Sequence, residues 1–346
     1  MSKEILVSKD DIKRLLECLG KERKLVAPVD TGRVIEFREV FTSGIQDSIK
    51  ILAKNTVSYK SLKEFYFPQA ELMFTFTKDD IIDNISLPGY VIFGARPCDL
   101  EALRIMSVVY TTGKYNDPFF KRHFETNLII GIGCTGEKPG CFCKEMEIDR
   151  EYSNFCDIML IDAGNDYSVV HLSEKGENAL KEVPEVYARY INSSGGLPAS
   201  KTEEPSPCSA SSGLMLDSSK KDSDYFDVID WEKVTKACKG CGICTYICPT
   251  CYCFDFRDIM EKGEAKRYKC WDSCMYPKFT LHASGHNPRE FRHERYRQRI
   301  LHKYKYVPDN FNGYVACTGC GRCIRSCPAG INIKDIVTLI ISQMEN

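Results

Sequence analysis

The chain has 346 residues, of which 43% are hydrophobic and 27% are charged, as in a soluble globular protein with room for two domains. Its formal net charge of -1 excludes the strongly basic surface of a typical nucleic-acid-binding protein. The sequence has no run of about 20 apolar residues that would span a membrane, and its charged amino terminus does not resemble a signal peptide. We therefore expect a cytoplasmic protein that inserts into no membrane and binds no nucleic acid.

The cysteine content narrows the class of protein. The chain contains 19 cysteines, an odd number, and many of them are grouped in tight C-x-x-C runs. A disulfide scaffold is typical of short secreted chains with a signal peptide, whereas this chain is long and lacks one. The spacing instead indicates metal ligation in a reducing compartment.

Residues 1–192 are predicted to form an α/β domain. The expected elements, in chain order, are a helix at 10–19, strands at 24–29, 34–37, 72–76 and 91–94, a helix at 100–109, a strand at 128–132, and a hairpin of strands at 159–162 and 168–171. The continuous apolar runs at 91–94 and 128–132 are typical of strands buried on both faces. The helix between them would connect them as a parallel strand–helix–strand unit.

The composition changes after this domain. Residues 193–224 are rich in Ser, Pro and Lys and offer little to bury, so we expect a linker or a surface insertion there. Cys208 lies inside this stretch and is interpreted as having no role in ligation. Residues 225–346 are cysteine-rich and helical in pattern, and they are assigned to a second domain.

Two cysteine runs in this second domain follow the pattern C-x₂-C-x₂-C-x₃-C-P of bacterial ferredoxins. In that pattern three cysteines hold one [4Fe–4S] cluster, and the fourth, before proline, holds the other cluster. The intervening glycines permit the positive φ that such a loop requires. The first predicted ligand set is Cys238, Cys241, Cys244 and Cys327, and the second is Cys317, Cys320, Cys323 and Cys248. A zinc site of four cysteines would use two C-x-x-C pairs instead.

The two runs are separated by a long insertion at 250–316, which favours a mostly helical ferredoxin-like architecture for the second domain. A basic stretch at 289–305 is predicted to be helical. It is interpreted either as a face for an acidic partner or for the charge of a cluster, or as a solvated helix face. Arg322 and Arg325, within the last cysteine run, likewise either raise a cluster potential, meet a partner or lie in solvent.

The insertion contains a further group of cysteines, Cys251, Cys253, Cys270 and Cys274. The sequence leaves a zinc site, a share in another cluster and simple packing all open for them. His282 and His286 are four residues apart and are weaker candidates that would share a helix face with this group. Cys18 and Cys156, in the first domain, are interpreted as buried structural cysteines.

A weaker constellation lies in the first domain. Cys98 follows the predicted strand at 91–94, and Cys134 follows the strand at 128–132, with Cys141 and Cys143 in the next loop. Because the carboxyl ends of parallel strands meet at one edge of a sheet, these four cysteines are expected near one another. A helix that begins at Asp99 would direct backbone N–H groups at an anionic cluster. Buried structural thiols are the alternative.

The segment 131–136 matches the dinucleotide-binding pattern G-x-G-x-x-G, but the loop that follows contains Pro139 and Gly140 and does not read as a helix. A nicotinamide or flavin site there is therefore the weaker interpretation. It would make the chain a flavin-binding iron–sulfur oxidoreductase with its own active site in the first domain.

The ordered series of motifs resembles the iron–sulfur (beta) subunit of soluble nickel–iron sulfhydrogenases and the corresponding iron–sulfur subunit of anaerobic sulfite reductases. The matching segments are F-Y-F-P at 65–68, E-L-M-F at 71–74, A-R-P-C-D at 95–99, Cys134 with C-F-C at 141–143, C-P-T-C-Y-C at 248–253, W-D-S-C at 271–274, G-H-N at 285–287 and the final cysteine run. The resemblance covers nearly the whole chain. It departs at the serine- and lysine-rich stretch and at Ser284, where a second glycine is usual.

The resemblance implies an anaerobic multisubunit enzyme in which this chain relays electrons and breaks no substrate bond. The implied partners are a flavin- and NAD(P)-binding subunit, which would carry FAD, and a catalytic redox subunit such as a hydrogenase or sulfite reductase. It also implies a third [4Fe–4S] cluster held by Cys98, Cys134, Cys141 and Cys143. Cys251, Cys253 and Cys274 belong to the shared pattern, whereas Cys270 does not. The terminal electron acceptor is left open.

Overall fold

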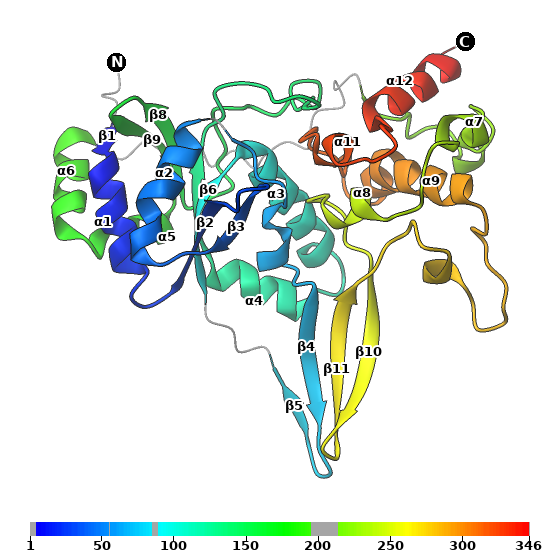
Figure 1. The fold of residues 1–346 in the computed structure, drawn as a ribbon, viewed down its shortest axis with the longest axis horizontal. Helices are drawn as coiled ribbons and strands as arrows, with labels where there is room; N and C mark the ends of the chain where they lie inside the picture. The colour runs from blue at the N-terminus through cyan, green and yellow to red at the C-terminus, as the bar shows by residue number, and fades with distance from the viewer. Residues whose placement is uncertain (1–4, 55, 85–88, 195–213, 346) are drawn as a thin grey trace.

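The computed structural model describes residues 5–54, 56–84, 89–194 and 214–345. It has three parts (Figure 1): an α/β body around a seven-stranded sheet, a four-stranded sheet that projects from the body, and a group of short helices near the carboxyl terminus. We call the projecting four-stranded sheet the arm.

The sheet of the body has the strand order β1-β9-β8-β7-β6-β2-β3. Its strands are β1 Ile5–Ser8, β2 Lys24–Asp30, β3 Ile35–Glu39, β6 Tyr90–Ala95, β7 Leu128–Ile132, β8 Ile158–Ala163 and β9 Asp166–Leu172. Strands β2, β6, β7 and β8 are mutually parallel, and the other pairs are antiparallel. The carboxyl ends of these four central strands therefore lie at the same edge.

Helices cover both faces of this sheet. They are α1 Lys9–Leu19, α2 Ile45–Ala53, α3 Pro97–Thr111, α4 Pro118–Thr126, α5 Glu174–Lys181 and α6 Pro184–Ser194. Alternate residues of β6 face the two layers of helices. Val91 and Phe93 pack with α1, α2, α5 and α6, whereas Ile92 packs with α3 and α4. Burial on both faces explains the uninterrupted apolar sequence of β6 and β7.

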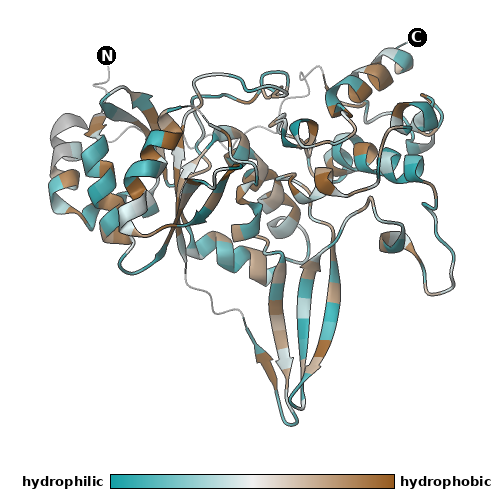
Figure 2. Ribbon diagram, in the orientation of Figure 1, coloured by the Kyte–Doolittle hydropathy of each residue, from teal (hydrophilic) through white to brown (hydrophobic). Residues whose placement is uncertain are grey.

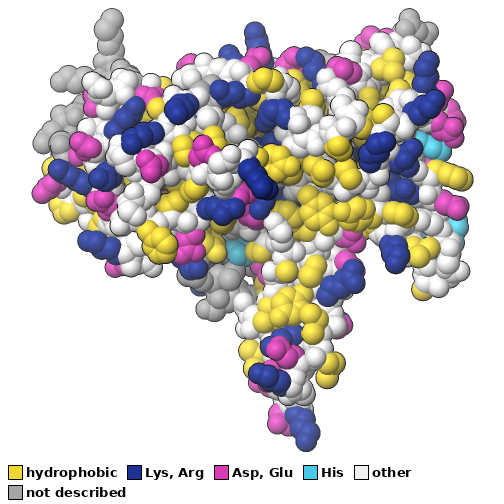
Figure 3. All heavy atoms as spheres, viewed as in Figure 1, with side chains coloured by type: hydrophobic (Ala, Val, Ile, Leu, Met, Phe, Trp, Pro, Cys, Tyr) yellow, Lys and Arg dark blue, Asp and Glu magenta, His cyan; other side chains and the backbone are white. Residues whose placement is uncertain are grey.

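The arm combines strands from two distant parts of the chain in the order β10-β11-β4-β5. Its strands are β4 Ala70–Phe76, β5 Ile81–Asp83, β10 Phe254–Glu261 and β11 Glu264–Trp271, and all neighbours are antiparallel. Hydrophilic and hydrophobic residues are mixed along these strands (Figure 2), as expected for an exposed sheet. Figure 3 shows basic and acidic side chains interspersed over the visible face of the molecule.

The carboxyl-terminal part contains α7 Trp231–Thr235, α8 Ile243–Tyr246, α9 Arg292–Leu301, α10 Val307–Asn310, α11 Arg322–Arg325 and α12 Ile333–Met344. A π-helical turn, His302–Tyr306, joins α9 to α10, and 3₁₀ turns lie at Thr42–Gly44, Leu62–Phe65, Asp222–Tyr225 and Pro277–Thr280. The core of this part forms around α9 and α12. Among the described residues, no helix is both long enough and apolar enough to cross a bilayer.

Most of the elements expected in the first 192 residues are present, including the crossover helix α3 and the β8–β9 hairpin. The expectation of a mostly helical carboxyl-terminal part is not confirmed, because two strands of eight residues each, β10 and β11, lie in it. The predicted linker at 193–224 lies largely outside the described residues. At its described end, Leu214 and Leu216 are buried in the carboxyl-terminal core.

A buried charge network fastens the arm to the body. Glu71 on β4 accepts a hydrogen bond from His123 of α4 at 2.8 Å and forms an ion pair with Lys269 of β11, also at 2.8 Å. Lys269 also reaches Asp117 at 3.4 Å. Burial alone would raise the pKa of Glu71, but the hydrogen bond with His123 and the charge of Lys269 lower it overall.

Replacing the buried carboxylate should therefore destabilise the protein in a pH-dependent way. We expect Glu71→Gln to lower the free energy of unfolding at pH 7 by roughly 3 kcal/mol, since it leaves Lys269 short of a partner. Because the pKa of Glu71 is lowered on folding, its contribution is present above the unfolded pKa and is lost as the pH falls through the folded value. The difference in thermal midpoint between the wild-type protein and Glu71→Gln, measured anaerobically, should therefore shrink as the pH is lowered. Glu261→Gln, which breaks an exposed pair with Lys266, is the control and should change little.

Candidate iron–sulfur centres

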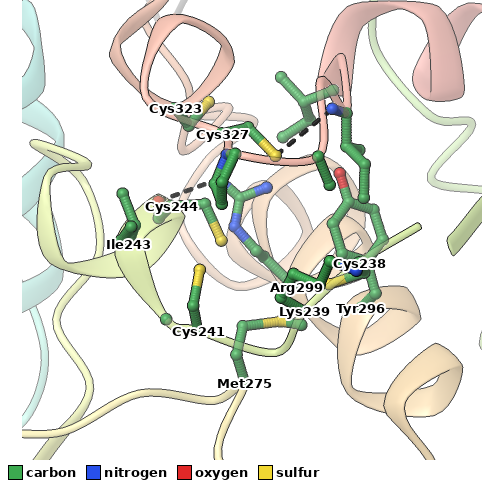
Figure 4. A pocket seen from close by; sticks show the side chains of 15 residues that line it. Cys238, Lys239, Cys241, Ile243, Cys244, Met275, Tyr296, Arg299, Cys323 and Cys327 are labelled. Atoms are coloured by element: carbon green, nitrogen blue, oxygen red, sulfur yellow. Dashed lines mark hydrogen bonds between the residues drawn. The ribbon is translucent and has the colours of Figure 1, made fainter.

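The first predicted ligand set lines a single pocket. Cys238, Cys241, Cys244 and Cys327 all line it, although they come from two distant segments of the chain. In Figure 4 the sulfur atoms of Cys241, Cys244 and Cys327 point toward the same space beside Arg299. Backbone N–H groups already donate to two of these sulfurs, from Gly240 to Cys238 at 3.4 Å and from Ile331 to Cys327 at 3.3 Å. Hydrogen bonds to the ligand sulfurs are among the features that set the potential of an iron–sulfur cluster.

Both cysteine runs use the same backbone geometry. Gly240 and Gly242 have φ of 65° and 76°, and Gly319 and Gly321 have φ of 58° and 71°. The second left-handed glycine in each run immediately precedes a short helix, α8 or α11. The expectation that these glycines supply positive φ is confirmed.

The second predicted ligand set lies beside the first. Burial is the largest effect on the Cys323 thiol and raises its pKa, and Cys248, Cys317 and Cys320 raise it further. Cys248 has two direct side-chain partners of different kind: the Lys303 ammonium donates to its sulfur at 3.2 Å, and the Thr250 hydroxyl lies at 3.3 Å. Cys323 also borders the pocket of the first set, so the two predicted cluster sites are immediate neighbours.

Three buried cations surround these cysteines. Lys63, Arg299 and Lys303 are 5%, 2% and 2% exposed, and no carboxylate in the described part of the chain forms an ion pair with them. They donate instead to backbone carbonyls of the cysteine loops, Arg299 to Cys244 at 3.2 Å and Lys63 to Cys251 at 3.0 Å. Burial alone would lower the pKa of Lys303, but the adjacent cysteine thiolates raise it overall. This arrangement fits a buried anionic group.

The predicted cysteines of the first domain also approach one another. Cys98 lies in the first turn of α3, and Cys134 follows β7 at the edge where the parallel strands end. Besides burial, the neighbouring Cys141 and Cys134 raise the pKa of Cys143, and Cys143 in turn raises the pKa of Cys98. Burial, the largest effect, raises the pKa of Cys143 to about 11.

The loop that carries this third set packs directly on the second cysteine run. The Phe142 backbone N–H donates to the Gly319 carbonyl at 2.7 Å. Gly319 has no room for a side chain, because a Cβ there would lie 2.5 Å from the Phe142 carbonyl group. Arg325 bridges the same two loops, donating to the carbonyls of Pro139 at 3.0 Å and Cys320 at 3.1 Å.

A buried ion pair joins the two halves of the chain at the same place. Arg322 is 1% exposed and contacts the Asp99 carboxylate through two nitrogens, at 2.8 and 3.0 Å. It also donates to the Ser58 carbonyl at 2.9 Å. The interpretation of Arg322 as a solvated residue is therefore wrong. Arg299 is likewise buried and faces Cys244, as the alternative of a basic face toward cluster charge requires.

The remaining candidates divide into two groups. Cys253 and Cys274 each shift the pKa of the other, and Cys251 also acts on the pKa of Cys274. Cys270, on β11, instead has Arg257 and Asp255 as its charged neighbours and stands apart. His282 and His286 lie on an exposed turn and not on a helix, so the expectation of a shared helix face is wrong.

Two further interpretations can be compared with the structure. No helix begins between β7 and β8, where a dinucleotide-binding loop at 131–136 would require one. Cys156 is buried and donates to the Ser153 carbonyl, as expected of a structural cysteine, and Cys18 is half-buried.

The buried cations Lys63, Arg299 and Lys303 were not assigned individually from the sequence, because a basic residue near a cysteine motif gives no sign of its burial.

The paired cysteine runs, their shared left-handed turns and the cations buried around them define an iron–sulfur protein. A family model described as a 4Fe-4S dicluster domain matches residues 237–331, so this part of the chain is a domain for two [4Fe–4S] clusters. The chain is 31% identical over 278 residues to the sulfhydrogenase 2 subunit beta of Pyrococcus furiosus, an alignment that covers 78% of this chain and 79% of the relative. It therefore belongs to the sulfhydrogenase beta-subunit family. No solved structure matches it.

The contact between Lys303 and Cys248 predicts an effect on cluster potential. A unit charge a few ångströms away contributes about 2–4 kcal/mol inside a protein, so Lys303→Met should lower one cluster potential by on the order of 100 mV. Lys305→Met is the matched control: Lys305 is equally buried in the same turn but bonds to Ser218 and Asp309. Potentiometric titration followed by electron paramagnetic resonance measures both. Equal shifts in the two variants would contradict the assignment.

The crossed ligand sets predict which cluster a single substitution impairs. Cys248→Ser should damage the cluster held by Cys317, Cys320 and Cys323 and leave the cluster held with Cys327 intact. Electron paramagnetic resonance of the reduced protein distinguishes the two signals. Loss of the cluster held with Cys327, with the other retained, would show that the crossed assignment is wrong.

Proposed function

We propose that this chain is the electron-transfer component of an anaerobic multisubunit oxidoreductase, and that it relays electrons between a catalytic redox subunit and a flavin- and NAD(P)-binding subunit. The support is its family, together with the two cysteine runs of the dicluster domain. Each [4Fe–4S] cluster supplies a one-electron carrier. The chain places the carriers and sets their potentials.

The observation that carries the proposal is the direct packing of three cysteine sets against one another. Cys323 borders the pocket of the first set, and Phe142, between two cysteines of the third set, bonds to Gly319 in the second run. We assign the third [4Fe–4S] cluster to Cys98, Cys134, Cys141 and Cys143. The second cluster then lies between the other two, and electrons pass along the series in steps.

The chain's own residues contribute positioning and charge compensation. Arg322 and Asp99 hold the edge of the body against the second cysteine run. Lys303 offsets negative charge at the second set and Arg299 at the first set, which favours the reduced state of each cluster.

We propose the domain boundaries 1–192 and 225–346, with 193–224 as the linker. We also propose a cytoplasmic location, since reduced thiolates require a reducing compartment.

Chemical analysis of the anaerobically purified chain tests the proposal. We expect at least about twelve iron and twelve acid-labile sulfide atoms per chain, about four of each for every one of the three proposed centres, and no flavin after denaturation. A Cys141→Ser, Cys143→Ser variant should lose about four of each, whereas the control Cys18→Ser should lose none. Stoichiometric flavin bound to the isolated chain would favour the rival function, a flavin-binding oxidoreductase with its own active site.

Reconstitution tests the relay. The native complex should reduce its clusters from NAD(P)H only when the flavin-binding partner is present, and the third-set variant should slow that reduction at least tenfold without removing the two dicluster signals. Unchanged rates in that variant would contradict the placement of the third cluster on the path.

A further inference from the structure

Three cysteines that belong to none of the proposed ligand sets are brought together at the base of the arm. Cys251 and Cys253 directly precede β10, and Cys274 follows β11. The hairpin register pairs Phe254 with Trp271, and the Asp272 N–H donates to the Cys253 carbonyl at 2.9 Å. The hairpin thus places Cys253, just before β10, opposite the segment that leads from β11 to Cys274.

The three cysteines lie close to one another and to the second ligand set. Cys253 and Cys274 are close enough for each to shift the pKa of the other, and Cys251 also acts on the pKa of Cys274. The Cys251 backbone N–H donates to the carbonyl of Cys248 at 3.4 Å, and Cys248 is assigned to the second cluster. The group is therefore an immediate neighbour of that proposed cluster site.

A buried cation without a carboxylate partner faces this group. Lys63 is 5% exposed, donates to the carbonyls of Cys251 at 3.0 Å and Thr245 at 3.3 Å, and lies 3.9 Å from the centre of the Trp271 ring. Burial lowers the pKa of Lys63 overall, and the neighbouring sulfurs of Cys251, Cys248 and Cys253 oppose that effect. Because an uncompensated buried cation is strongly destabilising, negative charge held at these cysteines would stabilise Lys63 in this position.

A single metal ion does not fit this group. Among the described residues no three His, Cys, Asp or Glu side chains are placed to hold one ion, and a structural zinc site needs four such ligands. The cysteines of the dicluster runs share this property, because a cubane separates its ligands more widely than one ion does. We propose that Cys251, Cys253 and Cys274 hold an additional iron–sulfur cluster through three thiolates, next to the second cluster. This inference rests on the proposed electron-transfer function.

Iron and sulfide analysis tests the inference. The fully loaded wild-type chain should contain about sixteen iron atoms, and the Cys253→Ser, Cys274→Ser variant should contain about four fewer. Cys270→Ser is the matched control, because Cys270 lies four residues before Cys274 and has other neighbours; it should lose none. An unchanged iron count in the double variant, or one zinc per chain in place of the iron, would overturn the inference.

A measurement on the unaltered chain covers the case in which the double variant fails to fold. In the loaded protein, iodoacetamide should leave Cys251, Cys253 and Cys274 unmodified, and removal of iron with a chelator should expose all three to alkylation. Mass spectrometry that found a Cys253–Cys274 disulfide in the loaded protein would overturn the inference. If Cys248→Ser loses iron and the double variant does not, only the additional cluster site is ruled out. If neither variant loses iron, the proposed function is ruled out as well.

Discussion

The structure depends on the compensation of buried negative charge. Cysteine thiolates that bind iron carry charge into a region from which water is excluded, and such charge is tolerated only beside cations or hydrogen-bond donors. Lys63, Arg299 and Lys303 are buried around the cysteine loops without carboxylate partners in the described chain. Arg322 differs, because it shares its charge between Asp99 and the cysteine run. The cations and the cysteines therefore depend on each other: either group alone would make this core unstable.

The sequence was informative where one local rule decides the outcome. The C-x₂-C-x₂-C-x₃-C-P runs specify the ligand spacing, and the left-handed glycines Gly240, Gly242, Gly319 and Gly321 are found as expected. The uninterrupted apolar runs of β6 and β7 predicted strands buried on both faces, which the two layers of helices confirm. Because the strands are parallel, the sheet edge brings Cys98 and Cys134 near the loop of Cys141 and Cys143.

The sequence was less informative where the partner lies far along the chain. Strands β10 and β11 carry charged residues at many positions, and the pairing of β11 with β4 depends on contacts across most of the sequence. The burial of Lys303 depends on the loop at Cys248, which no local pattern reveals. His282 and His286 were expected on a helix from their spacing alone, but their segment has no apolar face to bury and forms an exposed turn.

The composite origin of the arm has a consequence for how the polypeptide can be divided. Two of its strands precede Ser194 and two follow Leu214, and the pairing of β4 with β11 joins them. A chain cut between these residues would leave each fragment with an open strand edge that only the other fragment matches. The two pieces would therefore be expected to reassemble when produced together, as in split-protein complementation, and to aggregate when produced apart.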